Sequence, residues 1–209
     1  QEDAHEFLRH LVGKMAEGCL ERCGMSAATV GPLAETTAVH RIFGGYIRDQ
    51  LKCRSCGYCR DKYEAFLDLS LSLPLADGVD GVCSLEELFE RFTAVELMDE
   101  DNLWECGGCE RKVRAEKRVT VYKPPNALVL NLKRTAMPWE NDVEKLEQEV
   151  KFTGDLRLEV SGPERFAEYV LTGVVVHEGP SMSSGHYYAH VRSAAGQWQK
   201  MDDRNVTAV

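Results

Sequence analysis

The sequence of 209 residues lacks any long hydrophobic run, and none approaches the ~20 apolar residues that a membrane-spanning helix needs. It lacks a signal peptide, because the chain opens on the polar residues Gln1, Glu2 and Asp3. It also lacks an initiator methionine, so we expect residue 1 to fall inside a longer or processed protein. These absences argue against a membrane partner.

Basic residues are in the minority, with 25 Lys and Arg against 34 Asp and Glu, and the formal net charge is −9. Such a surface repels phosphate backbones, so we expect no nucleic-acid partner, whereas a basic protein or a basic peptide tail would be attracted. Apolar residues make up 44%, which is ordinary for a globular protein. The length suits one large domain or two small ones.

Cysteine is abundant, with eight in the chain. In a secreted protein this number would indicate a set of disulfides. Without a signal peptide the reducing interior of the cell is the better prediction, and there clustered cysteines more often bind metal. We therefore predict an intracellular protein, in the nucleus or the cytoplasm.

Hydrophobic periodicity predicts an α+β fold, helical first and then mostly antiparallel sheet. Helices are predicted over 4–22, with Asp3 as N-cap, and from Ser84, where Glu87 completes a capping box. An acidic and weakly periodic stretch at 139–149 is predicted to be a surface loop or a frayed helix, and 179–185 a flexible loop. Strands are predicted over 39–52, 65–73, 119–122, 127–132, 169–177, 187–191 and 197–201.

Two CxxC pairs, Cys53 with Cys56 and Cys106 with Cys109, predict one structural zinc site with four thiolate ligands. The 49 residues between the pairs exceed the ~15–20 of a compact zinc ribbon, so we expect each pair at the tip of a long hairpin. The alternative is that one pair is redox-active or merely buried. Cys59 follows closely and is a competing ligand.

His186 begins a predicted strand, and Asp202 follows sixteen residues later at the end of the next one. If these strands form a hairpin across Ala195–Gly196, their outer ends bring the two side chains within hydrogen-bonding reach. A carboxylate on one imidazole nitrogen fixes the tautomer and leaves the other nitrogen free to take a proton. By spacing alone, a histidine beside an acid at a hairpin end is more often structural than catalytic, and His177 and His190 are competitors.

Several segments resemble the conserved blocks of the ubiquitin-specific protease family. They occur in the family's order and cover nearly the whole chain, and QEDAHEFLR and IFGGY are most similar to its nuclear and nucleolar members. The blocks are Gln1–Leu8, Ile42–Tyr46, Tyr63–Leu73, Cys106–Lys117, Leu128–Arg134, Gly185–Ala189 and Trp198–Asp203.

The resemblance implies a papain-like hand with a thumb, a palm and zinc-bearing fingers. Residues 1–38 would form part of the thumb, 39–135 the fingers and palm strands, and 136–209 the palm with the histidine box. It implies a cysteine-type deubiquitinase that hydrolyses isopeptide or peptide bonds after the C-terminal glycine of ubiquitin. Ubiquitin and ubiquitinated proteins would be the partners.

The resemblance also implies roles for single residues. His186 matches the general base, Asp202 the residue that orients it, and Asp203 a polar position that helps to stabilise the oxyanion. Positions that meet ubiquitin in the family are matched by Asp3, Glu6 and Tyr187. The zinc ligands would be Cys53, Cys56, Cys106 and Cys109.

The family's nucleophile lies in a glycine–asparagine–x–cysteine box upstream of the block that begins at Gln1 here. We therefore expect the attacking cysteine outside this chain, and a hand that is incomplete at both ends, since the family's closing aromatic strand is missing after Val209. Cys19 and Cys23 end a helix, where the dipole disfavours a thiolate. The alternatives are an inactive ubiquitin-binding pseudoenzyme and a zinc-ribbon interaction scaffold.

Overall fold

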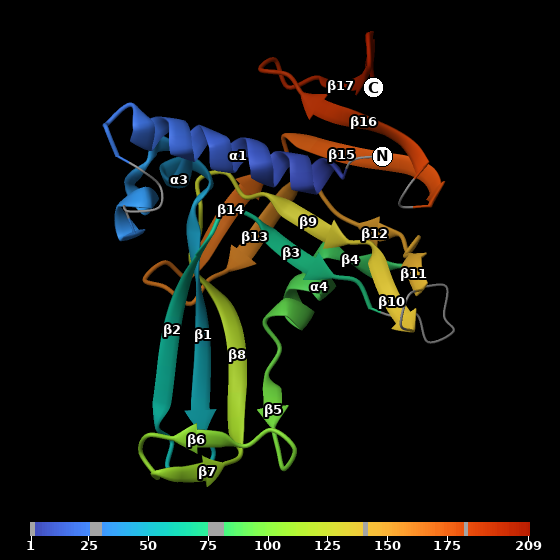
Figure 1. Ribbon diagram of the computed structural model, residues 1–209. Coiled ribbons are helices and arrows are strands. Elements are labelled where there is room, and N and C mark those ends of the chain that lie inside the picture. The colour runs from blue at the N-terminus through green and yellow to red at the C-terminus, as the bar shows by residue number, and fades with distance from the viewer. Residues whose placement is uncertain (1–2, 26–30, 75–81, 140–141, 182–183) are drawn as a thin grey trace.

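The computed structural model describes residues 3–25, 31–74, 82–139, 142–181 and 184–209 (Figure 1). Its helical segments are α1 (Ala4–Glu21), η1 (Gly31–Thr36, a 3-10 helix), α3 (Ala38–Phe43) and α4 (Leu85–Phe92). The strands of its first half are β1 (Gly45–Cys53), β2 (Cys59–Phe66), β3 (Leu69–Ser72), β4 (Cys83–Ser84), β5 (Glu96–Met98), β6 (Trp104–Cys106), β7 (Arg111–Val113) and β8 (Ala115–Lys123). Those of its second half are β9 (Leu130–Lys133), β10 (Thr135–Trp139), β11 (Asp142–Lys145), β12 (Val150–Lys151), β13 (Asp155–Glu159), β14 (Phe166–Val170), β15 (Gly173–Ser181), β16 (Ser184–Arg192), β17 (Trp198–Asp202) and β18 (Asn205–Ala208).

Helix α1 begins where the sequence predicts, because the Asp3 carboxylate accepts a hydrogen bond from the backbone N–H of Glu6 at 2.8 Å. It ends before Gly24, whose φ of +70° only glycine adopts without strain. Its first turn is fastened to the start of β3, since His5 Nε2 lies 2.8 Å from Asp68 Oδ2. The strand predicted over 65–73 is interrupted at 67–68, between β2 and β3.

The strand predicted over 39–52 is wrong at its start, where the chain forms helix α3. The Thr37 hydroxyl caps this helix by accepting from the backbone N–H of His40 at 3.2 Å. At its end, a Cβ on Gly44 would lie 2.3 Å from the His40 carbonyl oxygen, so only glycine fits. A local cap and a close turn thus outweigh the alternation of apolar residues.

A long sheet in the order β2-β1-β8-β5 extends away from the rest of the molecule, and we call it the arm sheet (Figure 1). Its strands pair antiparallel, and the β1–β2 turn and the β6–β7 hairpin meet at its far end. The tip has its own small core of buried residues: Leu51, Cys53, Trp104, Cys106, Val113 and Ala115.

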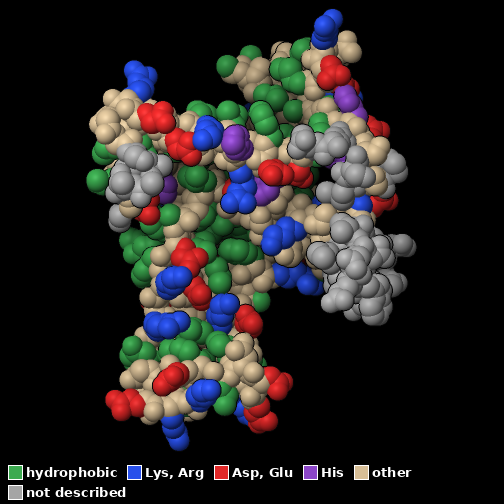
Figure 2. Space-filling view, in the orientation of Figure 1, with side chains coloured by type: hydrophobic (Ala, Val, Ile, Leu, Met, Phe, Trp, Pro, Cys, Tyr) green, Lys and Arg blue, Asp and Glu red, His purple; other side chains and the backbone are tan. Residues whose placement is uncertain are grey.

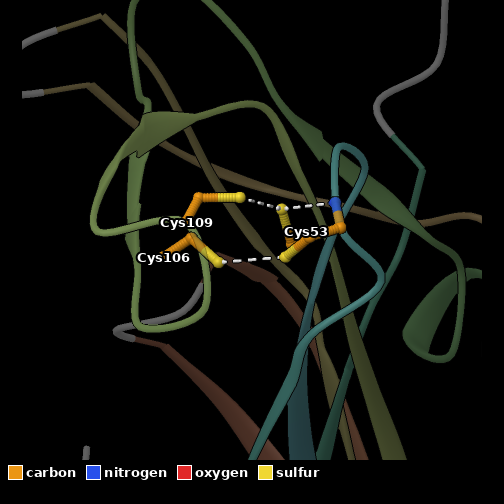
Figure 3. A group of neighbouring side chains, drawn as sticks. Cys53, Cys106 and Cys109 are labelled. Carbon is orange, nitrogen blue, oxygen red and sulfur yellow. Dashed lines mark hydrogen bonds between the residues drawn. The ribbon is translucent and has the colours of Figure 1, made fainter.

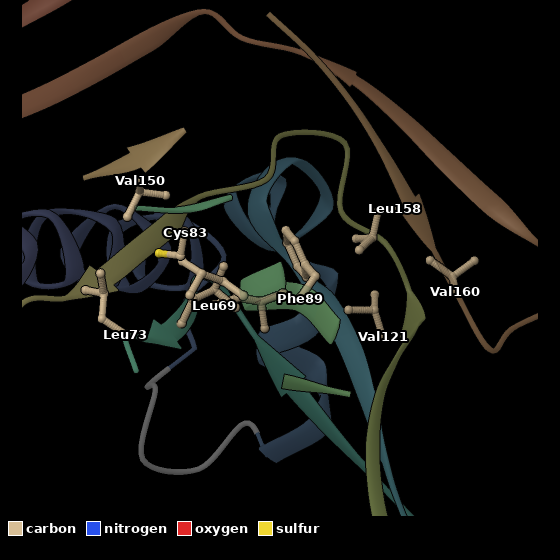
Figure 4. Packing of buried hydrophobic residues seen from close by; sticks show 10 residues of the cluster. Leu69, Leu73, Cys83, Phe89, Val121, Val150, Leu158 and Val160 are labelled. Carbon is tan, nitrogen blue, oxygen red and sulfur yellow. The ribbon is translucent and has the colours of Figure 1, made fainter. Parts of the chain in front are cut away.

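The main core lies where the arm sheet meets α4 and the parallel pair β3–β9 (Figure 4). Leu69, Leu71 and Leu73 are all buried, as their alternation predicted. Helix α4 carries the predicted capping box and buries Leu88 and Phe89 against them. Each buried leucine contributes about 1.5–3 kcal/mol of hydrophobic stabilisation.

The segment 139–149, predicted to be a surface loop or a frayed helix, is strand at 139 and 142–145 and irregular, as a loop would be, at 146–149. Strands β10 and β11 pair antiparallel here, with Thr135 opposite Lys145 and Ala136 opposite Glu144, while residues 140–141 lie outside the described part. Backbone pairing needs no apolar alternation, so hydrophobic periodicity gave no sign of this hairpin. The strand predicted over 127–132 forms only from Leu130.

The C-terminal sheet has the order β15-β16-β17-β18, and all its pairs are antiparallel. The predicted strand 169–177 is divided between β14 and β15, and the loop predicted over 179–185 is largely strand, with residues 182–183 outside the described part. Hydrophobic side chains are visible on this part of the surface in Figure 2, in keeping with the exposure of Val175 and Val206. The described helices include none long and apolar enough to cross a membrane.

Candidate active site and metal centre

The four cysteines of the two CxxC pairs come together at the tip of the arm sheet (Figure 3). Cys53 Sγ lies 3.7 Å from Cys109 Sγ, and Cys56 Sγ lies 3.7 Å from Cys106 Sγ. A tetrahedral ion with metal–sulfur bonds of about 2.3 Å holds its sulfurs about 3.8 Å apart. The spacing of these thiols therefore fits a tetrahedral metal site. The first pair lies at the tip of the long β1–β2 hairpin, as predicted, whereas the β6–β7 hairpin of the second pair is short.

Backbone N–H groups point at the sulfurs, as they do where a chain wraps an ion. The N–H groups of Ser55 and Cys56 donate to Cys53 Sγ at 3.3 and 3.4 Å. Burial raises the pKa of the Cys53 thiol, but these N–H groups and the neighbouring thiols outweigh it and lower the pKa to about 6. A hydrogen bond with Cys56 and burial raise the pKa of Cys109 to about 12. Four thiols so close do not all ionise alone, and a bound dication would supply the missing positive charge.

Cys59, the competing ligand, lies outside this group. Its exposed thiol donates to the Gly57 carbonyl at 3.5 Å, and the cluster of potential metal ligands contains only the four predicted cysteines at this tip. Gly57 itself has a φ of +75°, which lets the chain turn after the first pair.

His186 and Asp202 meet at the open end of the C-terminal sheet. The β16–β17 hairpin turns at Gly196, with a φ of +83°, and brings His186 Nε2 to 2.6 Å from Asp202 Oδ1. The imidazole is about half exposed, with 48% of its side-chain surface accessible. The spacing argument for this pair is therefore confirmed as geometry.

The charges around this pair favour a hydrogen-bonded pair over a cation site. The hydrogen bond to Asp202 raises the pKa of His186, and the same bond lowers the pKa of Asp202, with Lys200 lowering it further. Asp202 is therefore an ionised acceptor, and His186 donates its Nε2–H to it. Lys200 Nζ lies 2.9 Å from the other oxygen, Asp202 Oδ2, where it would repel a metal ion.

Asp203 lies in the same group of side chains, with its carboxylate within 4.8 Å of the ligand atoms of His186 and Asp202. It is exposed and has a φ of +52°, an uncommon value for a residue other than glycine. This conformation turns the chain from β17 into β18.

The family described as ubiquitin carboxyl-terminal hydrolase matches residues 1–209, the whole chain. The chain is 39% identical over its full length to ubiquitin carboxyl-terminal hydrolase 23 of Arabidopsis thaliana, of which it covers 24%. It is 35% identical, again over its full length, to ubiquitin carboxyl-terminal hydrolase 17-like protein 13 of Homo sapiens, of which it covers 38%. The chain belongs to the ubiquitin carboxyl-terminal hydrolase family. It spans less than half the length of these two relatives.

Solved structures show the same fold. A SAGA DUB module containing Ubp8, Sgf11, Sus1 and Sgf73, bound to monoubiquitin, matches with a TM-score of 0.82 and 28% identity over 100% of this chain and 45% of the other. A second such module, bound to ubiquitin aldehyde, matches with a TM-score of 0.81 and 26% identity over 100% of this chain and 46% of the other. The papain-like catalytic fold implied by the sequence blocks is thus confirmed.

The residues predicted to meet ubiquitin lie in two places. Asp3 and Glu6 begin α1, where Asp3 also serves as the helix cap and Glu6 is exposed. Tyr187 is on β16, and its ring lies 4.6 Å from the ring of His177 on β15. Asp3 and Glu6 are thus at the start of α1, whereas Tyr187 directly follows His186 on β16.

None of the eight cysteines, all of which lie in the described part, has a recorded contact with His186. The quartet is at the opposite end of the molecule from β16 and β17 (Figure 1). Cys83 is buried in the main core, and Cys19 and Cys23 lie at the end of α1 that is farther from β15. The family's cysteine is therefore not replaced from within this part of the chain.

The geometry around His186 predicts the direction in which its pKa is shifted. Its folded-state pKa is raised above the ordinary value of about 6.5, so the pair's contribution to stability is complete below that pH and is lost as pH rises through the folded pKa. On the acid side, Asp202 has a lowered pKa, so its contribution is lost as pH falls through that value. We expect an NMR titration midpoint for His186 above 6.5 that falls back in Asp202→Asn. A midpoint at or below 6.5 that Asp202→Asn leaves unchanged contradicts this.

Gly185, directly before His186, permits the close pairing of β15 and β16. An added Cβ would lie 2.4 Å from His177 Nε2 and 2.5 Å from the Glu178 carbonyl oxygen. Backbone must shift to relieve this, so Gly185→Ala is expected to cost about 1–3 kcal/mol in unfolding free energy and to bring the pKa of His186 back toward its ordinary value. Denaturant unfolding and NMR titration measure both. The matched control is Gly154→Ala, which has open space, and equal effects of the two substitutions would refute the explanation.

Lys200 is the part of the site that the sequence argument missed. It falls within the histidine-box block. Its position two residues before Asp202 on a predicted strand was the available signal, because such residues point to the same face of a strand. The register of β16 against β17, which places them beside Tyr188, came only from the structure.

Proposed function

We propose that this chain carries the histidine–aspartate pair of a thiol-dependent deubiquitinase, which hydrolyses isopeptide or peptide bonds after the C-terminal glycine of ubiquitin. The observation that carries the proposal is the 2.6 Å contact of His186 Nε2 with Asp202 Oδ1 in a chain of this family. Membership alone would suit an inactive relative as well, whereas this contact prepares a histidine for proton transfer.

The roles of the two imidazole nitrogens follow from the hydrogen bond between His186 and Asp202. Asp202 accepts from Nε2–H, so the lone pair of His186 is on Nδ1, which takes the proton of a cysteine thiol. The thiolate attacks the carbonyl carbon of the last glycine, and His186 returns the proton to the leaving amine as the C–N bond breaks. Water, deprotonated by the same nitrogen, then releases ubiquitin from the acyl-enzyme. Asp203 is proposed to help stabilise the oxyanion.

The attacking cysteine is proposed to come from sequence outside residues 1–209. The described cysteines belong to the quartet, are buried in the main core or lie on elements far from β16. The thumb, fingers and palm assignments over 1–38, 39–135 and 136–209 belong to this proposal. So does a structural zinc at the cysteine quartet, where the ion would tie the β1–β2 turn to the β6–β7 hairpin and leave no open position for chemistry.

Ubiquitin is the proposed partner. Two of the matching solved structures hold ubiquitin or ubiquitin aldehyde, and an excess of acidic side chains suits a basic peptide tail. We assign contacts with ubiquitin to Asp3, Glu6 and Tyr187, of which Tyr187 directly follows His186 on β16. We also propose, from the cysteine content, that the protein is located in the nucleus or the cytoplasm.

Two measurements test the function. The chain alone is titrated with ubiquitin, and the protein expressed with its native upstream sequence is assayed for release of a fluorophore from a ubiquitin C-terminal amide. We expect binding by the chain alone and turnover only with the upstream sequence. Binding without any turnover in either form would show the pseudoenzyme, and absence of binding at millimolar ubiquitin would show a scaffold.

A further inference from the structure

Asp202 is held on both of its oxygens. His186 Nε2 lies 2.6 Å from Oδ1, and Lys200 Nζ lies 2.9 Å from Oδ2. Lys200 precedes Asp202 by two residues on β17, so the two side chains leave the same face of the strand. The carboxylate is thereby bridged between an imidazole and an ammonium, and it cannot rotate without breaking one of these contacts.

The ammonium is itself held from a second side. Lys200 Nζ lies 4.1 Å from the centroid of the Tyr188 ring on β16, a distance at which the negative face of the ring attracts a cation. Tyr188 in turn meets His190 edge to face at 5.5 Å. Only 34% of the Lys200 side-chain surface is accessible, so this side chain is partly buried and held by its contacts.

The charges that face His186 are mostly negative. Asp202 and Asp203 lie beside it, and Glu178 is its cross-strand partner on β15. The nearby cation on β11, Lys145, donates to the Gly179 carbonyl on β15. The cation that forms an ion pair with the Asp202 carboxylate is the Lys200 ammonium.

We propose that Lys200 is a positioning residue of this site, whose ammonium is bonded to the Asp202 carboxylate and offsets part of its charge toward His186. The inference rests on the proposed function, because it assigns Lys200 a role in the same proton transfer. A base that is too strongly stabilised as imidazolium is protonated at neutral pH and cannot accept the thiol proton. Lys200 opposes that, since its charge lowers the pKa of His186 while the bond to Asp202 raises it.

The test is an NMR titration of His186 in the 209-residue chain, in wild type, Lys200→Met and Lys200→Arg. Removing the charge in Lys200→Met is expected to shift the His186 midpoint upward. Lys200→Arg keeps the charge and is expected to retain the wild-type midpoint. The matched control is Lys112→Met, an exposed lysine at the tip of the arm sheet, which leaves the midpoint unchanged. An unchanged or lower midpoint in Lys200→Met, or an equal shift in the control, overturns the proposal.

Two further observations keep the outcome unambiguous. Dispersed amide spectra establish that each variant is folded, and Lys200→Gln replaces Lys200→Met if the latter is not. The titration requires no turnover, so it decides the role of Lys200 even if the chain proves to be a pseudoenzyme. In a protein that does turn over ubiquitin amides, the acid limb of kcat/KM for Lys200→Met is expected to move to higher pH, with activity recovering at alkaline pH. An unmoved acid limb contradicts the role.

Discussion

Replacing His186 with alanine in the protein that includes its upstream sequence is expected to abolish turnover of ubiquitin conjugates and to leave ubiquitin binding intact. A positioned general acid–base group contributes about 10²–10⁴-fold to the rate, and a thiol without a base is poorly ionised near neutral pH. The imidazole is about half exposed and outside both hydrophobic clusters, so its loss leaves no buried cavity. Steady-state kinetics and a binding titration separate the two effects.

The matched control is His190→Ala. This histidine lies four residues further along β16 and packs edge to face on Tyr188, but has no recorded contact with Asp202. We expect it to retain turnover within about tenfold of wild type, below the range of a lost acid–base group. Full activity in His186→Ala, or equal losses in both variants, would show that the wrong histidine was chosen.

The second large effect is expected at the cysteine quartet. Wild-type chain is expected to hold about one zinc ion, as one four-thiolate site requires, and Cys106→Ser to lose it and unfold the tip of the arm sheet. Zinc binding contributes about 10–16 kcal/mol to the folding of small zinc-finger peptides, far more than the tip's small buried cluster could replace. Metal analysis and thermal unfolding provide the measurements.

Cys59→Ser is the control for the zinc prediction, because Cys59 lies three residues after Cys56 but is exposed and outside the quartet. It is expected to keep both the metal and the stability of wild type. Stably folded wild-type protein with no metal, or loss of metal in Cys59→Ser and not in Cys106→Ser, would refute the assignment of ligands.

Where a local signal and the global fold agreed, the sequence was sufficient. Asp3 and Ser84 cap the helices that they were predicted to cap, and the alternating leucines of β3 are buried. The two cysteine pairs meet in one cluster, as the two CxxC motifs predicted. The His186–Asp202 contact needed only the turn at Ala195–Gly196 and a two-residue strand period.

The remainder depended on information that periodicity does not carry. Helix α3 results from a Thr37 cap and a tight turn at Gly44, and β10 and β11 pair through their backbones. Strand β18 lies after Asp203, whose positive φ a sequence pattern does not reveal. The packing of Lys200, the second partner of Asp202, over the Tyr188 ring required the register of β16 against β17.

The most direct test of the central claim is the pH dependence of kcat/KM for a ubiquitin C-terminal amide, measured on the protein with its native upstream sequence. The account predicts turnover whose acid limb has a midpoint above 6.5, since the pKa of His186 is raised, and equal to the His186 midpoint from NMR. Absence of turnover, or an acid limb that does not follow the titration of His186, would contradict the account.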